Sequence, residues 1–372
     1  MNKYNFVASC LMGVEKLLSD ELKYIGAENV KAENGRVFFD GDDSIFARAN
    51  IRSRFAERIL LLTGRFIAKS FDELFCEVKK IPWENFIPEN GKFPVAGSCL
   101  SSALHSVSDC QSIIKKAIVE RLKTVYHHDY FQETGAVFKI RFLLLKDEAC
   151  IMIDTSGEPL HKRGYRANSN DAPLKETLAA VLVDLSRVHY DDTVIDPCCG
   201  SGTILIEAAQ KALRIPPNSK RKFVSEDWHF PDKKIWSDEK ILAENEIRIN
   251  TVFHGYGYDI DENALAVAQQ NAEKAGVAEY LTFSKRDIAD FSENFDSAVI
   301  ICNPPYGERL LDLNSAETIY RIMGEKFYRR QGWRYTIISP EDDFEKFFGR
   351  RADKRRKLYN GMIRCQVYQY FK

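Results

Sequence analysis

Apolar residues recur along the first part of the chain at spacings that predict alternating helices and strands. An apolar residue at every third or fourth position from 14 to 25 predicts an amphipathic helix. Short apolar runs at 6–10 and 36–40 predict strands on either side of it, and Asp42 is a candidate N-cap for a second helix. This order of elements indicates a small α+β unit over residues 1–63.

The alternation continues into a second unit and then changes. Helical spacing at 71–78 and 111–126, followed by two strands up to residue 154, indicates another α+β unit. Beyond residue 160, buried apolar strands alternate with helices, which is typical of an α/β domain with a mainly parallel, Rossmann-like sheet. We therefore expect a ferredoxin-like α+β unit, a second α+β unit and an α/β domain, with bounds 1–63, 64–160 and 161–372.

Composition narrows the class of protein. The chain has 372 residues, of which 45% are hydrophobic, and it contains no run of about 18 apolar residues, so we expect a globular protein without a membrane partner. The start lacks the apolar region of a signal peptide, and the nine cysteines form no Cys-x-x-Cys pair. These features argue against a zinc site or a disulfide framework and favour a cytoplasmic location. Because the formal net charge is only −1, any contact with nucleic acid must depend on local basic patches.

A glycine-rich turn is the first candidate site. The short apolar strand at 194–196 leads through a Gly-Ser-Gly turn into a helix at 204–213. Two close glycines let the backbone turn sharply, and the free N–H groups at the helix start face a ligand. The stretch resembles motif I of the S-adenosylmethionine-dependent amino-methyltransferases, whereas Gly-x-Gly alone would suit any tight strand-to-helix turn. The resemblance implies a cofactor-binding set of Asp196, Pro197, Cys198, Gly200, Ser201, Gly202 and Thr203.

A second motif follows about a hundred residues later. Residues 297–302 have the pattern of a buried strand that stops at Asn-Pro-Pro-Tyr, because proline cannot donate to a strand ladder. Ligands bind at the carboxyl ends of strands in an open α/β sheet. Asn-Pro-Pro-Tyr is the catalytic signature of methylases that act on exocyclic amino groups of bases, and the alternative is a strand-ending turn with a buried tyrosine. The resemblance implies that Asn303 orients the amine, that Pro304, followed by Pro305, accepts from it through its carbonyl, and that Tyr306 stacks on a flipped base.

Acidic residues at the ends of two further strands complete the predicted cofactor site. A carboxylate after the second strand can accept from two ribose hydroxyls, so Asp259 is preferred to Asp261, which suits a helix N-cap. The resemblance implies a polar side chain against the adenine at Asp287, with Asp290 as the alternative. Residues 173–185 predict a helix that begins at a proline. Its segment 174–177 resembles motif X, which borders the methionine end of the cofactor, and a helix with only a packing role is the alternative. These additions to the set are Ile260, Ile288, Lys175, Glu176 and Thr177.

Basic residues in three places are candidate contacts to RNA. The second unit resembles a THUMP domain, a module of RNA-binding proteins, on the segments 104–106, 109–111 and 115–118; a structural unit with solvated lysines is the alternative. The hinge-like segment 155–173 carries a basic and aromatic cluster that suits phosphates and a base, or a plain exposed linker. Residues 214–250 could be a wall of the active site or a surface insertion. The predicted RNA-binding residues are Lys115, Lys116, Lys162, Arg163, Tyr165, Arg166 and Arg309.

The whole chain resembles the bacterial family that joins a ferredoxin-like and THUMP N-terminus to such a methylase, on three stretches at 161–166, 196–203 and 303–310. The resemblance implies a class I methyltransferase sheet with an antiparallel last strand. It also implies methyl transfer from S-adenosylmethionine to guanine N2 in RNA, with 23S rRNA favoured, S-adenosylhomocysteine as product, and neither a metal nor an obligate protein partner. The alternatives are a tRNA guanine-N2 methyltransferase, an N6-adenine methylase of DNA or RNA, and a non-catalytic RNA-binding protein. A dinucleotide oxidoreductase ranks lower because Leu205 replaces the last glycine of Gly-x-Gly-x-x-Gly.

Overall fold

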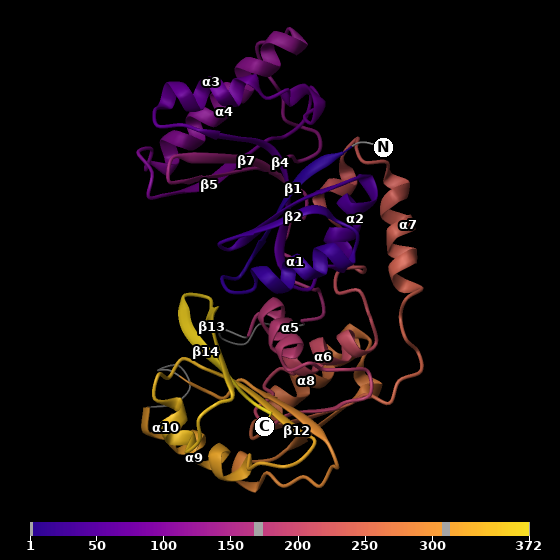
Figure 1. The fold of residues 1–372 in the computed structure, drawn as a ribbon. Helices are drawn as coiled ribbons and strands as arrows, with labels where there is room; N and C mark the ends of the chain where they lie inside the picture. Colours follow the sequence, from indigo (N-terminus) through magenta and orange to yellow (C-terminus); the bar gives the residue numbers. More distant parts are fainter. Residues whose placement is uncertain (1–2, 167–173, 307–312, 372) are drawn as a thin grey trace.

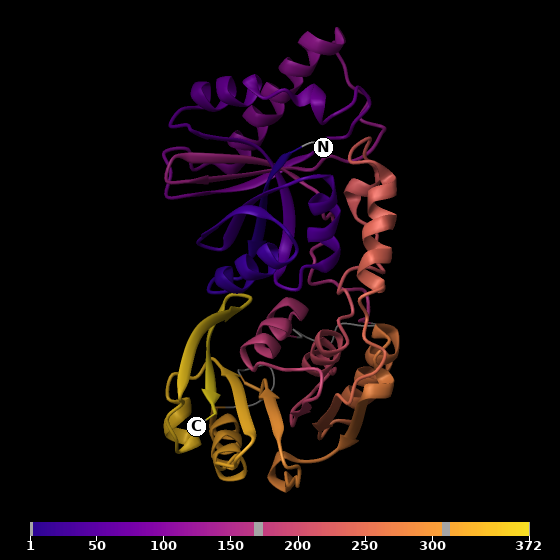
Figure 2. The same cartoon turned by 45° about the vertical axis from the view of Figure 1, so that its right-hand side comes forward.

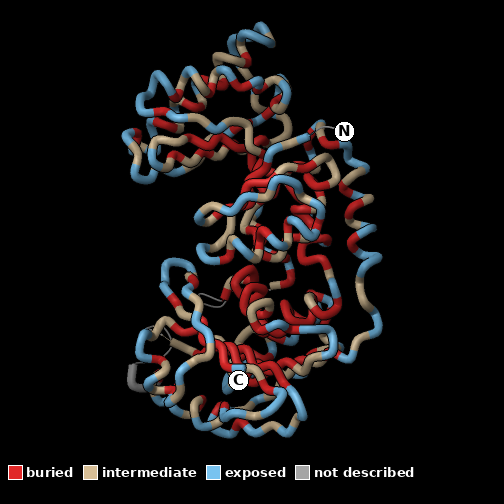
Figure 3. Tube along the Cα trace, in the orientation of Figure 1, coloured by how far each residue is buried: buried red, intermediate tan, exposed pale blue. Residues whose placement is uncertain are grey.

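The computed structural model describes residues 3–166, 174–306 and 313–371 (Figure 1). These residues form two seven-stranded sheets, one from the strands up to residue 154 and the other from the strands after residue 192. Buried residues concentrate in the sheets and in the helices that cover them (Figure 3). Within the described ranges, no helix is long and apolar enough to cross a membrane.

The N-terminal sheet is continuous across the two predicted α+β units. Its order is β2-β3-β1-β4-β7-β6-β5, and only the β5–β6 pair is parallel among these neighbours. Strand β4 runs through residue 63, so the domain boundary predicted there remains a prediction and coincides with no break in the sheet. The strands are β1 (Tyr4–Cys10), β2 (Glu28–Glu33), β3 (Arg36–Gly41), β4 (Ala56–Ile67), β5 (Val95–Leu100), β6 (Ile140–Leu145) and β7 (Glu148–Asp154).

The helices of this half follow the predicted apolar spacing. Leu18 and Leu22 of the first helix are fully buried, and Asp42 caps the second helix by accepting a hydrogen bond from Ile45 N. The sequence does not predict β2, because its residues are mostly polar, as suits a strand at the edge of a sheet. The helices are α1 (Glu15–Tyr24), α2 (Asp43–Arg52), α3 (Phe71–Lys80) and α4 (Val107–Tyr126), with a 3-10 turn η1 (Trp83–Asn85).

The C-terminal sheet has the order β10-β9-β8-β11-β12-β14-β13. The first five of these strands are parallel and β14 is antiparallel, which confirms the predicted Rossmann-like sheet with an antiparallel last strand. The strands are β8 (Thr193–Asp196), β9 (His254–Asp259), β10 (Leu281–Lys285), β11 (Ala298–Cys302), β12 (Trp333–Ser339), β13 (Lys354–Asn360) and β14 (Ile363–Tyr370). The helices are α5 (Glu176–Leu185), α6 (Thr203–Ala212), α7 (Lys233–Glu244), α8 (Glu262–Ala275), α9 (Leu313–Lys326) and α10 (Phe344–Phe348), with 3-10 turns η2 (Val224–Asp227), η3 (Ala278–Tyr280) and η4 (Ile288–Asp290).

The order of the C-terminal strands reverses between β8 and β11. The chain moves outward from β8 to β9 and β10, and then crosses back to β11 on the other side of β8. Such a switch point leaves a crevice at the carboxyl ends of the two central strands, where ligands bind in open α/β sheets. The glycine-rich turn follows β8 and Asn-Pro-Pro-Tyr follows β11, so the fold brings both motifs to this crevice.

The insertion at 214–250 packs against the N-terminal half, a role that differs from both alternatives left open by the sequence. The ring of Trp228 stacks on Phe138 at 4.8 Å between centroids. Arg48 of α2 pairs with the buried Glu239 of α7 at 2.7 Å. Figures 1 and 2 both show α7 running alongside α2. The insertion therefore joins the two halves of the chain.

Candidate active site

The Gly-Ser-Gly turn lies between β8 and α6 at the centre of the sheet edge. Gly200 and Gly202 have φ angles of +50° and +76°, which glycine adopts without strain. A Cβ atom at Gly202 would lie 3.0 Å from the Cβ of Ala268, so this glycine is also required by close packing. At Gly200 no described atom lies within 4 Å of a Cβ position. A ligand can therefore approach the main chain of the turn at Gly200.

Two carboxylates border this turn. Asp196 is 1% exposed, and burial, together with the charge of Asp259, raises its pKa to about 8. Asp259 ends β9, and its Oδ2 accepts a hydrogen bond from Gly200 N at 2.8 Å. Asp261 caps α8, as predicted. A carboxyl group with a pKa of about 8 is mostly neutral at neutral pH, and a cation beside it would favour its ionised form. S-adenosylmethionine carries two cationic groups, an ammonium and a sulfonium. The residues present fit this cofactor.

The predicted adenine side of the site lies at the ends of β9 and β10. Asp287 is exposed, and its carboxylate caps η4 by accepting from Ala289 N at 2.8 Å. Ile260 is 65% exposed whereas Ile288 is buried. Their contacts with adenine remain predictions. In the described part of the chain, no group of three or more His, Cys, Asp or Glu side chains is placed to hold a metal ion.

Asn303 stands in the crevice beside the glycine-rich turn. Strand β11 pairs in parallel with β8, with Ile300 opposite Ile195, so the residues after both strands emerge side by side. The Oδ1 atom of Asn303 is buried and accepts no hydrogen bond from the residues that the structure describes. A buried carbonyl oxygen without a donor costs free energy, so such atoms are rare. An N–H group of a ligand would satisfy this oxygen.

Tyr306 is held in place from β13. Asn360 Nδ2 donates a hydrogen bond to the Tyr306 hydroxyl at 2.8 Å. Burial raises the pKa of this hydroxyl to about 12, so it stays protonated at neutral pH. The anchored hydroxyl restricts the orientation of the ring near Asn303. No local sequence pattern indicates this role of Asn360, because its partner lies 54 positions away in the chain.

The motif X residues contact protein groups from other elements. Thr177 Oγ1 donates to Glu57 Oε1 at 2.5 Å, and Lys175 Nζ lies 3.5 Å from the same carboxylate. Glu176 pairs with Arg166 at 3.1 Å. These contacts give α5 the packing role that was the alternative, and cofactor binding by the three residues remains a prediction.

Two residues of the basic cluster at 161–166 are buried, although the sequence predicted that they bind RNA. Arg163 and Tyr165 are each only 4% exposed. Both contact Glu207 of α6, with Arg163 Nε at 3.3 Å and the Tyr165 hydroxyl at 3.1 Å. The prediction that these two residues bind RNA is therefore wrong, because their side chains offer almost no surface. Alternating charged and aromatic residues have the same pattern in a buried ion-pair network as on an RNA-binding surface.

Arg166, also predicted to bind RNA, contacts the helix that follows the glycine-rich turn. It is half-buried, and its Nη2 donates to Thr203 Oγ1 at 3.0 Å, which links the linker to the glycine-rich turn. This contact indicates that Arg166 supports the cofactor site, and its binding to RNA remains a prediction.

The remaining predicted RNA contacts differ in how accessible they are. Lys115 Nζ lies 2.5 Å from Glu133 and is thus already paired. Lys162 pairs with Glu158 at 2.6 Å on the surface, and Lys116 is exposed. Arg309 lies outside the described residues. For these three lysines and Arg309, RNA binding remains a prediction.

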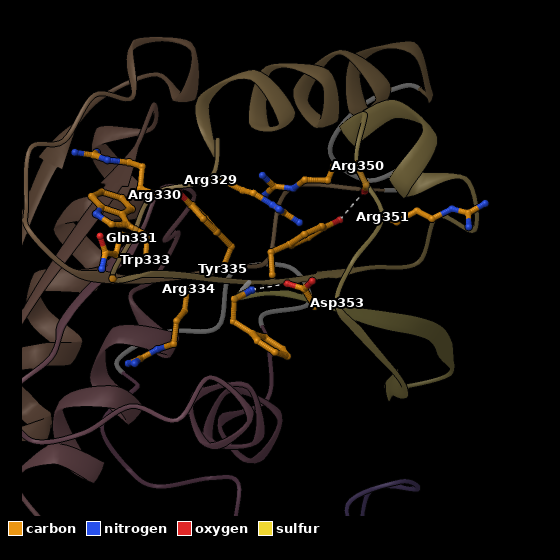
Figure 4. Close-up of a pocket in the computed structure, with 12 residues that line it drawn as sticks. Arg329, Arg330, Gln331, Trp333, Arg334, Tyr335, Arg350, Arg351 and Asp353 are labelled. Atoms are coloured by element: carbon orange, nitrogen blue, oxygen red, sulfur yellow. Dashed lines mark hydrogen bonds between the residues drawn. The ribbon is translucent and has the colours of Figure 1, made fainter.

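A cavity of about 510 Å³ lies at the other edge of the C-terminal sheet, where β12 begins (Figure 4). Two residues of the basic stretch at 350–357 contribute to its lining, and Arg350 Nη2 donates to Phe327 O at 2.9 Å. This edge carries the amino ends of the parallel strands, so the cavity is separate from Asn303. The arginines that line it are Arg329, Arg330, Arg334, Arg350 and Arg351.

The fold and the crevice together define a Rossmann-like methyltransferase that follows a ferredoxin-like and THUMP region. Family comparison agrees: residues 163–369 match the model described as "RMKL-like, methyltransferase domain". Residues 5–60 match "RlmL ferredoxin-like domain" and residues 68–154 match "THUMP domain". The chain belongs to the RMKL-like methyltransferase family.

Individual relatives extend over the whole chain. "Putative RNA methyltransferase YpsC" of Bacillus subtilis is 44% identical over 100% of this chain and 97% of its own length. "Ribosomal RNA large subunit methyltransferase K/L" of Psychromonas ingrahamii is 34% identical over 96% of this chain, which spans only 49% of that relative. The crystal structure of SMU.472, described as "a putative methyltransferase complexed with SAH", has a TM-score of 0.94 and 39% identity, and the match covers 100% of this chain and 98% of that one.

Proposed function

We propose that this protein transfers a methyl group from S-adenosylmethionine to the exocyclic N2 of a guanine in RNA, with large-subunit rRNA as the favoured substrate. The observation that carries the proposal is the Oδ1 atom of Asn303, a buried acceptor without a donor in the described residues. It lies in the switch-point crevice beside the glycine-rich turn. An exocyclic amine presents the N–H groups that this acceptor lacks.

The residues of the crevice divide into two groups by role. The main chain at Gly200 and the carboxylates of Asp196 and Asp259 hold the cofactor, which supplies a methyl group on a sulfonium. Asn303 Oδ1 and the Pro304 carbonyl accept hydrogen bonds from the amine, which localises its lone pair and directs it at the methyl group. The ring of Tyr306 stacks on the base. Positioning of the two reacting groups supplies most of the rate enhancement.

The choice of RNA rests on the N-terminal half and on the relatives. Residues 68–154 match a THUMP domain, the type of module that the sequence analysis connected with RNA. The Bacillus relative is named an RNA methyltransferase, and the longer relative is named for ribosomal RNA of the large subunit. A cytoplasmic location, as the cysteine usage predicts, belongs to the same proposal.

Transfer of labelled methyl groups tests the proposal. The purified protein would be incubated with labelled S-adenosylmethionine and unmodified large-subunit rRNA, unmodified tRNA or duplex DNA, and the methylated nucleoside would be identified by mass spectrometry. We expect N2-methylguanosine in the rRNA. N2-methylguanosine in tRNA alone would overturn the substrate, and N6-methyladenine in DNA would overturn the reaction on guanine.

A further inference from the structure

The β13–β14 hairpin ends beside the candidate active site. Because β14 runs antiparallel to β12, the tip of the hairpin at 360–363 lies at the carboxyl edge of the parallel strands. Asn360, the last residue of β13, donates to the hydroxyl of Tyr306 at 2.8 Å. The tip is thus attached directly to the motif that is proposed to hold the methylated base.

The tip is apolar where a hairpin turn is usually polar. Gly361, with a φ of +63°, forms the turn after Asn360, and the next residue is Met362. Met362 is 98% exposed and Ile363 is 48% exposed. Residues with polar side chains usually follow such turns. Exposed apolar side chains gain free energy by moving into an apolar environment, and methionine adapts its shape to irregular gaps.

The hairpin is supported from two sides. Leu358 is fully buried, and a Cβ atom at Gly13 of the N-terminal half would lie 3.2 Å from its Cδ2 and 3.0 Å from Lys357 O. On the other side the hairpin is bonded to Tyr306. Figures 1 and 2 show it projecting from the C-terminal sheet toward the N-terminal half. These contacts hold the hairpin in place, so an exposed apolar side chain at its tip can contact a partner.

Cations flank the tip. Lys357 of β13 is exposed and forms no ion pair within the part of the chain that the structure describes. Arg364 of β14 is also exposed and pairs with Asp342 at 2.6 Å. An apolar tip between cations fits a nucleic acid, because phosphates meet the cations while the apolar side chain meets the bases.

We propose that Met362 is a wedge that enters the base stack of the RNA and fills the space left by the guanine that turns out toward Asn303. The inference rests on the proposed function, since it requires an RNA base as methyl acceptor. Enzymes that modify a base must extrude it from the stack, which costs a few kcal/mol of unstacking and unpairing. Apolar side chains inserted between bases are a known way to offset that cost.

Two substitutions test the wedge. Met362→Ala removes the side chain, and Met362→Gln keeps its length but makes it polar. The control is Ile249→Ala, which removes another exposed apolar side chain, 80% exposed, from the segment before β9. The substrates are a folded large-subunit rRNA transcript and, once the methylated guanine is mapped, a short unstructured RNA that contains it. We expect both Met362 variants to methylate the folded transcript about tenfold more slowly than the wild type, and the short RNA at the wild-type rate.

A fluorescent base reports the step itself. With 2-aminopurine next to the target guanine in a folded RNA, binding of the wild type should raise the fluorescence, and binding of Met362→Ala should not. Equal rates of wild type and Met362→Ala on the folded transcript would overturn the wedge, as would an equal loss on both RNAs. If the wild type itself methylates no RNA, the proposed function fails instead, so the two failures are distinguishable.

Discussion

The amide oxygen of Asn303 is buried beside a glycine-rich turn and has no donor among the described residues. Folding leaves this polar group unsatisfied, which costs free energy that the neighbouring packing must offset. Such a cost is expected at a site that a ligand completes. At the scale of single residues, the account depends on this oxygen and on the buried carboxylate of Asp196.

We predict that Asn303→Ala lowers the rate of methyl transfer by about a hundredfold, the usual scale for removing one hydrogen-bonding group from an active site. The affinity for S-adenosylmethionine should stay within about twofold, since Asn303 is assigned to the base and not to the cofactor. Single-turnover assays and calorimetry measure the two quantities. The matched control is Asn245→Ala, which changes an exposed asparagine at the end of α7. Full activity of Asn303→Ala would contradict the assignment.

The buried Asp196 predicts a specific dependence of stability on pH. Its pKa rises on folding from 3.8 to about 8, so the folded state disfavours the ionised form. The free energy of unfolding should therefore decrease as the pH rises from about 4 to about 8, by at most about 1.4 kcal/mol per pH unit from this group. Asp196→Asn removes this effect.

Thermal unfolding at pH 5 and pH 8 checks that prediction. The Tm advantage of Asp196→Asn over the wild type should be larger at pH 8 than at pH 5, while its affinity for S-adenosylmethionine falls. Asp290→Asn, which changes an exposed carboxylate, serves as the control. An advantage that is the same at both pH values would show that Asp196 is not the titrating group.

At the scale of elements, the linker before α5 has a structural role. Arg163, Tyr165 and Glu207 form a buried network that ties the linker to α6. Arg166 extends this contact to Thr203, at the start of the same helix. The linker thereby fixes the helix that follows the glycine-rich turn, and the hairpin tip holds Tyr306 from the other side of the crevice.

We predict that Arg163→Ala lowers the free energy of unfolding by about 3 kcal/mol, because removal of one partner leaves a buried charge uncompensated. Lys162→Ala should change it by well under 1 kcal/mol, since that lysine forms only a surface ion pair. Denaturant unfolding measures both. If Arg163→Ala kept its stability and instead lost affinity for RNA, the Arg163 side chain would face RNA and would not belong to a buried network.

At the scale of the whole molecule, local patterns in the sequence predicted those structural features that are determined by residues close together in the chain. The glycine-rich turn needs two close glycines, and the strand before Asn303 must end because prolines follow it. Alternating apolar strands and helices likewise predicted the C-terminal sheet, and its order then brought both motifs to one crevice.

The features that the sequence could not predict depend on contacts between distant residues. Asn360 reaches Tyr306 across 54 positions, and the insertion packs on Phe138 and Arg48 of the other half. Burial of Arg163 depends on Glu207, which is 44 positions away. No local pattern records such pairings, so a buried ion pair and an exposed basic cluster have the same sequence signature.

The central claim is that this molecule methylates a guanine of large-subunit rRNA at N2. The most direct test is mass spectrometry of nucleosides from the rRNA of a strain that lacks the gene. We predict that one N2-methylguanosine disappears from the large-subunit rRNA, and that expression of the wild type, but not of Asn303→Ala, restores it. An unchanged set of N2-methylguanosines in the rRNA of that strain would contradict the account.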